Sequence, residues 1–239
     1  MSTGSSGMME VCAGRLMWMR SLKLHNFRYT TMLSDGDSKL YNEIVKLNPY
    51  GDKFSVKKEE CVNHVGKRLG SALRNLVQDL SKRKITLGGN GHGRLTQGSI
   101  TKLTKYYTRS IRKHDSASEM KKAIYASLNH CFSTDDNPLH SLCPTGENSW
   151  CFYNSALAKH RQPKPHKKLV HTPLDKALIW PHIKSVYERM TSDGLLARCE
   201  LKGTQNSNES MHSVVWSKCP KIGFFSKKKG RVRTDSWNL

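Results

Sequence analysis

The longest amphipathic repeat of the sequence lies within residues 58–83, and it constrains the fold more than any other feature. Apolar residues recur there every three or four positions, at Val62, Val65, Leu69, Leu73, Leu76 and Leu80. This spacing places them on one face of an α-helix, so we predict a helix over residues 58–83 that packs against other helices. A glycine-rich run at residues 88–91 ends the pattern.

Further helices are predicted downstream of this repeat. Thr96 and Ser116 are candidate N-cap residues, and Ser116 forms a capping box with Glu119 three positions later. The stretches behind both caps carry apolar residues at helical spacing. Two more helices are expected, near residues 174–190 and over residues 206–219. The chain from residue 58 onward is therefore predicted to contain five helices separated by irregular segments.

The first fifty residues show a different pattern. Apolar positions at helical spacing predict a helix over residues 8–23. In residues 27–33, β-forming residues alternate with period two, which is typical of a strand. An acidic turn follows at residues 34–37, and residues 40–47 then have one apolar helical face. A strand, an acidic turn and a helix in this order indicate the α/β class for this part of the chain.

The charge of the chain limits its partners. Of the 239 residues, 40 are Lys or Arg and 19 are Asp or Glu, and the resulting formal net charge of +21 is spread along the sequence. A polyanion is the expected partner, and nucleic acid is favoured over an acidic membrane surface. A basic structural protein of the ribosome or of chromatin would have the same charge. No apolar run approaches the roughly 18 residues of a membrane span, and no signal peptide is apparent, so we expect neither a membrane nor a secreted protein.

The segment between residues 130 and 151 is rich in possible metal ligands. Seven cysteines without a secretory signal are expected to be reduced thiols or metal ligands rather than disulfides. Five soft ligands fall within one loop that also contains proline and glycine: His130, Cys131, His140, Cys143 and Cys151. Bound Zn²⁺ would supply the folding energy that such a loop lacks. We predict a tetrahedral zinc site that uses the last three of them and one of the first two, although the spacing is not that of a common zinc finger.

Acidic residues stand at two places where ligand-binding carboxylates are usual. Asp35 and Asp37 lie where the predicted strand is followed by a helix, and side chains there converge at the carboxyl end of a sheet. The Asp-Gly-Asp sequence is also typical of an ordinary turn, and Asp37 could cap the next helix. Glu209 opens the last predicted helix, where an acid also interacts favourably with the helix dipole. Both interpretations stay open from these residues alone.

Cys61 and His64 form a C-x2-H pair at the beginning of the long predicted helix. Their spacing puts both side chains on one face of a helix, close enough to share a metal ion or to orient one another. Two ligands do not make a metal site, and a buried thiol beside a helix histidine is the commoner explanation of such a pair.

Several short motifs occur in order along the chain. They are Gly-Ser-Ser-Gly-Met-Met-Glu at 4–10, Arg-Tyr-Thr-Thr at 28–31, Asp-Gly-Asp-Ser-Lys at 35–39, Glu-Cys-Val-Asn-His-Val at 60–65, Gly-Arg-Leu-Thr at 93–96, Cys-Pro at 143–144, Ser-Trp-Cys at 149–151 and Thr-Gln-Asn-Ser-Asn-Glu-Ser at 204–210. Together they resemble the Mutator-like transposase domain of animal mobile elements over about residues 4–222. The resemblance also argues against a cloning linker at residues 4–7.

The resemblance implies a ribonuclease-H-like catalytic core with a large, mainly helical insertion. In such enzymes an Asp-Asp-Glu triad holds two divalent cations, Mg²⁺ or Mn²⁺, which activate the attacking oxygen and stabilise the leaving one during DNA strand cleavage and transfer. Asp35 is implied as the second acid, with Asp37 as the alternative, and Glu209 is implied as the third. Cys61 and His64 are implied to be the C-x2-H signature of the superfamily, in a role that supports the active-site architecture.

The resemblance also divides the chain. Residues 1–68 are expected to be the second part of the core, 69–200 the helical insertion with the zinc loop at 130–151, 201–222 a terminal core helix, and 223–239 a disordered basic tail. The implied partner is DNA and the implied location is the nucleus. A homo-oligomer is compatible with the intact family.

Three functional hypotheses follow from these observations. The family's first acid lies upstream of the segment at residues 4–7, so we expect it to be missing here together with the opening strands. The first hypothesis is accordingly a transposase fragment with negligible strand transfer. The alternative is a non-catalytic, transposase-derived DNA-binding protein whose affinity falls steeply with salt. The third is a degenerate product that does not fold stably, which broad melting would indicate.

Overall fold

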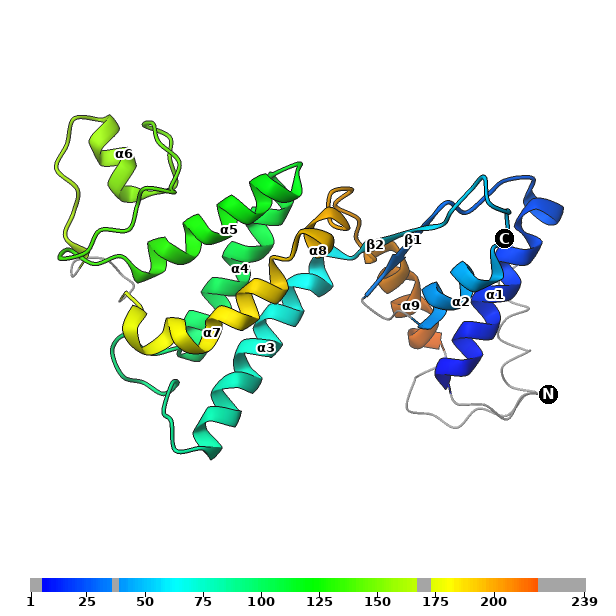
Figure 1. The fold of residues 1–239 in the computed structure, drawn as a ribbon, viewed down its shortest axis with the longest axis horizontal. Helices are drawn as coiled ribbons and strands as arrows, with labels where there is room; N and C mark the ends of the chain where they lie inside the picture. The colour runs from blue at the N-terminus through cyan, green and yellow to red at the C-terminus, as the bar shows by residue number, and fades with distance from the viewer. Residues whose placement is uncertain (1–5, 36–38, 167–172, 219–239) are drawn as a thin grey trace. The chain divides into compact units, whose positions relative to one another are not determined.

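The computed structural model describes residues 6–35, 39–166 and 173–218, which are mainly helical (Figure 1). The elements in chain order are α1 (Ser6–His25), β1 (Thr31–Ser34), α2 (Lys39–Leu47), β2 (Lys57–Glu60), α3 (Val62–Lys82), α4 (Gln97–Lys113), α5 (Ala117–Phe132), α6 (Phe152–Ala158), α7 (Lys176–Met190), α8 (Asp193–Ala197) and α9 (Asn206–Lys218). The chain divides into two compact units, residues 1–203 and 204–239. None of the described helices combines the length and the apolar character that crossing a bilayer requires.

The strands β1 and β2 form a small parallel sheet. Thr31 pairs with Lys57 at one end of the sheet, and Ser34 pairs with Glu60 at the other. Parallel strands need a crossover connection, which α2 supplies. The core of this unit consists of three buried side chains, Met32, Ile44 and Val56. The parallel unit supports the predicted α/β class, whereas a ribonuclease-H-like core stays a prediction because the described sheet has two strands.

Helix α1, which confirms the helix predicted over residues 8–23, packs against α2. Aromatic side chains also join it to the neighbouring loops. The Trp18 indole donates to the Tyr29 carbonyl oxygen at 3.1 Å. The Tyr50 hydroxyl lies 2.8 Å from the Ser21 hydroxyl, and it accepts from the Tyr29 backbone N–H at 2.8 Å. These bonds fix the chain that leads into β1.

Two sequence-based boundaries in this region were wrong. The strand predicted over residues 27–33 is shorter, because pairing with β2 begins only at Thr31. The long helix predicted from residue 58 begins at Val62, since Lys57–Glu60 forms β2. Lys and Glu have low strand propensity, so nothing in this local sequence indicates a strand. Backbone pairing with β1 decides its conformation.

The helices α3, α4, α5, α7 and α8 form a second, larger core, which we call the helical body. Helix α3 lies against α4 and α7, α4 lies against α5, and α5 lies against α8 (Figure 1). Side chains from all five helices join one apolar cluster that includes Leu69, Ile100, Ile124, Ile183 and Leu196. Gly66 allows α4 to approach α3 closely, because a Cβ at this position would clash with the Thr108 hydroxyl.

The predicted N-caps of the helical body are confirmed. The Thr96 hydroxyl accepts from the Ser99 backbone N–H, and the Ser116 hydroxyl accepts from the Glu119 backbone N–H. The expected domain boundary between residues 68 and 69 falls inside α3, which is unbroken along its whole length. Helix α3 therefore contributes to the helical body from its first turn.

The helical body begins and ends at the same place beside β2. The Glu60 backbone N–H donates to the Arg198 carbonyl oxygen at 2.8 Å. The Val62 backbone N–H donates to the Gly203 carbonyl oxygen at 3.1 Å. Backbone hydrogen bonds thus join the two ends of the segment that builds the helical body.

The second unit contains α9, which confirms the helix predicted from residue 206. None of its described side chains is buried. The basic tail predicted to be disordered at residues 223–239 lies outside the described residues.

Candidate functional site

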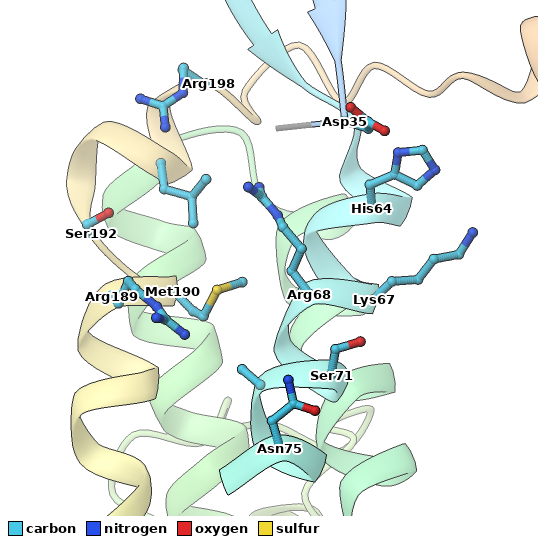
Figure 2. A pocket seen from close by; sticks show the side chains of 12 residues that line it. Asp35, His64, Lys67, Arg68, Ser71, Asn75, Arg189, Met190, Ser192 and Arg198 are labelled. Atoms are coloured by element: carbon cyan, nitrogen blue, oxygen red, sulfur yellow. The ribbon is translucent and has the colours of Figure 1, made fainter. Parts of the chain in front are cut away.

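The chain after β1 brings Asp35 to the edge of an open groove with a volume of about 730 Å³ (Figure 2). One side of the groove is α3, and the other is formed by the end of α7 and by α8. Asp35 is exposed at one end of the groove, close to His64 from α3. Four cationic side chains also line it, namely Lys67, Arg68, Arg189 and Arg198. We call this surface the cationic groove.

A buried carboxylate fixes two of these cations. Glu60, at the end of β2, is 2% exposed. Its Oε2 accepts from Arg68 Nη2 at 2.8 Å, and its Oε1 accepts from Arg198 Nε at 3.4 Å. A buried carboxylate needs such partners, because removing an unpaired charge from water is costly. Both arginine side chains remain more than a third exposed, so they are held in place while they still face the groove.

The other two cations, Lys67 and Arg189, are exposed. Neither makes an ion pair with a side chain in the described part of the chain. Figure 2 shows Lys67 on the outer side of α3 and Arg189 at the end of α7. The four cations outnumber the carboxylates of Asp35 and Glu60. The surface therefore attracts anions, and an open groove of this charge suits a phosphodiester backbone.

The predicted triad has three candidate acids in this chain. Asp35 lies in the cationic groove. Asp37 lies outside the described residues. Glu209 is exposed in the first turn of α9 in the second unit, where its backbone N–H donates to the Gln205 carbonyl oxygen at 2.9 Å. The groove as described is lined by one carboxylate, which is too few to hold two divalent cations, so the triad stays a prediction.

The C-x2-H pair lies where β2 leads into α3, but its two side chains have different surroundings. Cys61 is the N-cap residue, is fully buried, and donates its backbone N–H to the Ser34 carbonyl oxygen at 3.0 Å. His64 is half-buried and lines the cationic groove. Neither belongs to the metal-ligand cluster found among the described residues. The pair connects the end of β1 with the groove, and its implied supporting role stays a prediction.

The second candidate site is a group of four side chains that we call the His/Cys cluster: His130, His140, Cys143 and Cys151. Their ligand atoms all lie within 4.8 Å of one another. His130 comes from the last turn of α5 and is half-buried, and Cys151 is the buried N-cap residue of α6. His140 and Cys143 are buried in the loop between the two helices. This arrangement could hold a metal ion.

The structure distinguishes the neighbours His130 and Cys131. Cys131 belongs to the apolar core of the helical body, where burial raises the pKa of its thiol to about 11. Adjacent residues on a helix point about 100° apart, so His130 faces the loop instead. The sequence contained a signal for this choice, since Cys131 continues the apolar stripe of Ile124 and Leu128 at helical spacing.

Burial and sulfur contacts set the electrostatics of the His/Cys cluster. Burial lowers the pKa of His140, which favours its neutral imidazole. Hydrogen bonding between the Cys143 and Cys151 sulfurs raises the pKa of Cys143 and lowers the pKa of Cys151. A neutral imidazole and a thiolate are the forms of these side chains that bind metals.

Residues 2–151, more than half of the chain, match the family model described as Mutator-like transposase. The matched region contains Asp35, the C-x2-H pair and the complete His/Cys cluster. Neither a curated protein nor a solved structure matches the chain. The resemblance based on the sequence motifs is confirmed, and the chain belongs to the Mutator-like transposase family.

Proposed function

We propose that this transposase-derived chain binds DNA in the cationic groove and holds the phosphodiester backbone next to Asp35. The observation that supports this most directly is the convergence of four cations around one acid of the predicted triad. These cations come from α3, from the end of α7 and from the residue that follows α8. Membership of a transposase family makes DNA the natural polyanion.

The four cations have different roles in this proposal. Arg68 and Arg198 are pre-oriented by Glu60, so little side-chain entropy is lost when they contact a phosphate. A guanidinium group also matches the planar geometry of phosphate oxygens. Lys67 and Arg189 are exposed cations that would add contacts at the rim. Such contacts depend on charge alone, so binding is expected to be independent of DNA sequence.

The proposal keeps Asp35 and Glu209 as two acids of an Asp-Asp-Glu centre, with Asp37 as the alternative to Asp35. Mg²⁺ or Mn²⁺ at such a centre would supply nucleophile activation and leaving-group stabilisation for strand transfer. The groove of the described chain has one carboxylate among its cations. We therefore expect this polypeptide to bind DNA without a divalent cation, and we expect its strand transfer by itself to be negligible.

Binding is tested with the full chain and a fluorescent duplex of arbitrary sequence, by anisotropy at several salt concentrations. The double variant Lys67→Gln with Arg189→Gln removes two groove cations that have no described ion-pair partner. We expect roughly a 10-fold loss of affinity and a salt dependence that is shallower by about two released counterions. A variant that lost no more affinity than its control would contradict the proposal.

The matched control is Lys82→Gln with Lys184→Gln, which removes the same charge from the same helices, α3 and α7. Both lysines lie outside the groove and pair with acids on their own helices, Lys82 with Asp79 at 3.1 Å and Lys184 with Glu188 at 3.8 Å. We expect less than a twofold change for the control, because each lysine is already partly neutralised by its neighbour.

Cleavage is tested separately by incubating the protein with supercoiled plasmid in Mg²⁺ or Mn²⁺. We expect no nicking above background. Nicking by the unmodified chain that disappears in Asp35→Asn or Glu209→Gln would show an active centre. This result would contradict the predicted lack of strand transfer, and it would not affect the proposal of DNA binding.

We also propose a nuclear location, which agrees with a DNA-binding role, and we expect a fluorescent fusion to accumulate in the nucleus. Self-association belongs to the same proposal, because transposition in the intact family could require more than one copy. Sedimentation of the chain with and without DNA measures it, and a strict monomer in both conditions would contradict this part.

A further inference from the structure

We propose that the His/Cys cluster binds one structural Zn²⁺ ion through Nδ1 of both histidines and Sγ of both cysteines. Four protein ligands fill a tetrahedral zinc site completely, so no position is left for a catalytic water. The inference is independent of the cationic groove, because none of the four residues lines that groove.

Four of the six distances between the ligand atoms match the edges of a zinc tetrahedron. The Nδ1 atoms of His130 and His140 are 3.2 Å apart. Cys143 Sγ lies 3.7 Å from His130 Nδ1 and 4.0 Å from His140 Nδ1, and Cys151 Sγ lies 3.5 Å from His140 Nδ1. Zn–N bonds of about 2.05 Å and Zn–S bonds of about 2.3 Å give tetrahedral edges of about 3.3 Å between nitrogens and about 3.6 Å between nitrogen and sulfur. The four distances agree with these edges to within about 0.4 Å.

A chain of hydrogen bonds turns the ligating nitrogen of His140 toward the centre. Asp135 Oδ1 accepts from His166 Nδ1 at 2.7 Å, which leaves His166 Nε2 as an acceptor. This atom lies 3.2 Å from His140 Nε2, and the Ser133 hydroxyl lies 2.9 Å from the same nitrogen. A proton on His140 Nε2 satisfies these contacts and leaves the lone pair of Nδ1 free for a metal. Metal-bound histidines are commonly oriented by such a carboxylate-linked partner.

The charge of the site favours a dication. Cys143 and Cys151 are 4% and 0% exposed, yet neither belongs to the apolar core of the helical body. Two thiolates and Zn²⁺ make a neutral centre, which can be buried at low cost. Binding forms two Zn–N bonds and two Zn–S bonds, releases to solvent any proton that the two sulfurs still carry, and changes no oxidation state.

The loop around the cluster has few other interactions that could order it. Within the described residues 133–166, α6 is the one regular element of more than one turn, and no side chain is a buried member of the core of the helical body. The Asn154 side-chain amide donates to the carbonyl oxygens of His140 and Cys143 at 3.3 and 3.1 Å, which closes the loop around the ligands. Zinc would join this loop and α6 to the end of α5.

The first test measures metal in the full chain, purified under reducing conditions without a chelator. Elemental analysis should find one zinc per chain, and a mercurial that blocks thiols should release it. After exchange with Co²⁺, we expect the visible bands of a tetrahedral site and the charge-transfer absorption of two thiolates. A folded chain without metal, an octahedral cobalt spectrum, or a Cys143–Cys151 disulfide would each overturn the inference.

The second test uses variants to identify the ligands. Cys143→Ser and His130→Asn should lose the stoichiometric zinc, whereas Cys131→Ala and the exposed thiol variant Cys12→Ser should retain it. His166→Gln should keep one zinc but weaken its affinity roughly 10- to 100-fold, because the orienting partner is lost. Retention of zinc by His130→Asn together with its loss from Cys131→Ala would reject the proposed ligand set. If a ligand variant does not fold, the cobalt spectrum of the unmodified chain still decides the question.

Discussion

The cationic groove and the His/Cys cluster are held together in opposite ways. The groove is built from segments far apart in sequence, with 138 positions between Glu60 and the Arg198 that it binds, and its cations remain exposed. The cluster is built within residues 130–151, and three of its four side chains are buried. Exposed cations contribute little to folding because water already solvates them, whereas buried ligands decide whether their loop can fold. Substitutions of the groove cations should therefore lower DNA affinity with little effect on the free energy of unfolding. Substitutions in the cluster should lower the stability of its loop with little effect on DNA affinity.

The largest effect on stability is expected from removing the metal. At a free zinc concentration 1,000 times the Kd, binding stabilises the folded loop by about 4 kcal/mol. A strong zinc chelator should lower the free energy of opening residues 133–158 by about that amount. Amide hydrogen exchange measures this, and peptides from α3 and α4 provide the internal control. Equal loss of protection in α3 would contradict a local role for the metal, and no loss anywhere would remove its stabilising role.

A smaller loss of stability is expected for Glu60→Gln, which links the groove to the fold. The substitution leaves Arg68 and Arg198 without their shared carboxylate. Because both arginines can still be solvated, we expect a loss of about 1–2 kcal/mol rather than the larger cost of a fully buried charge. Removing this anion favours DNA binding, whereas losing the pre-orientation of Arg68 and Arg198 weakens it, so we expect a smaller change in DNA affinity than for the Lys67→Gln, Arg189→Gln variant. Urea unfolding and anisotropy measure the two effects, and a large loss of binding at full stability would contradict this account of Glu60.

Tyr107→Phe tests whether the stability of the helical body can change without an effect on either site. The buried Tyr107 hydroxyl donates to the Met190 carbonyl oxygen at 2.7 Å, and burial places the pKa of this phenol far above its ordinary value. Loss of this hydrogen bond should cost about 1 kcal/mol in urea unfolding. Zinc content and DNA affinity should not change. A change in either would mean that the helical body and the sites are more strongly coupled than the comparison assumes.

The smallest effect on stability is expected from the groove variant itself. Lys67→Gln with Arg189→Gln should change the free energy of unfolding by less than about 0.5 kcal/mol, because both side chains are exposed. The same protein should bind DNA more weakly, as proposed above. Thermal melting of this variant is compared with that of the Lys82→Gln, Lys184→Gln control. A lower melting temperature in the groove variant alone would mean that its weaker binding results from a less stable fold.

The elements with strong local signals were predictable from sequence. The caps Thr96 and Ser116 and the apolar stripe of α3 lie in the residues that form those helices, so their signals survive without tertiary context. The metal-ligand cluster was also anticipated, because its members are close in sequence. The choice between His130 and Cys131 depended on the rotation of α5, which the apolar stripe of that helix already encodes.

The groove could not be predicted in the same way. Strand β2 consists of two lysines and two glutamates, and it forms because β1 offers backbone partners. Arg189 and Arg198 reach the groove only through the packing of α7 and α8 in the helical body. No periodicity relates these positions to Asp35, so a search for motifs finds the acid and misses the cations around it.

The hydrogen bonds that join the two ends of the helical body affect how well the chain tolerates changes in the length of this segment. A segment whose entry and exit lie side by side can be lengthened or shortened without moving the β1–β2 sheet that precedes it, because closing the remaining chain costs little extra entropy. Glu60 and Val62 stand at the entry of the helical body, and their partners Arg198 and Gly203 stand at its exit. We therefore expect insertions in the loops of the helical body to leave the hydrogen bonds at its base, from Glu60 to Arg198 and from Val62 to Gly203, unchanged.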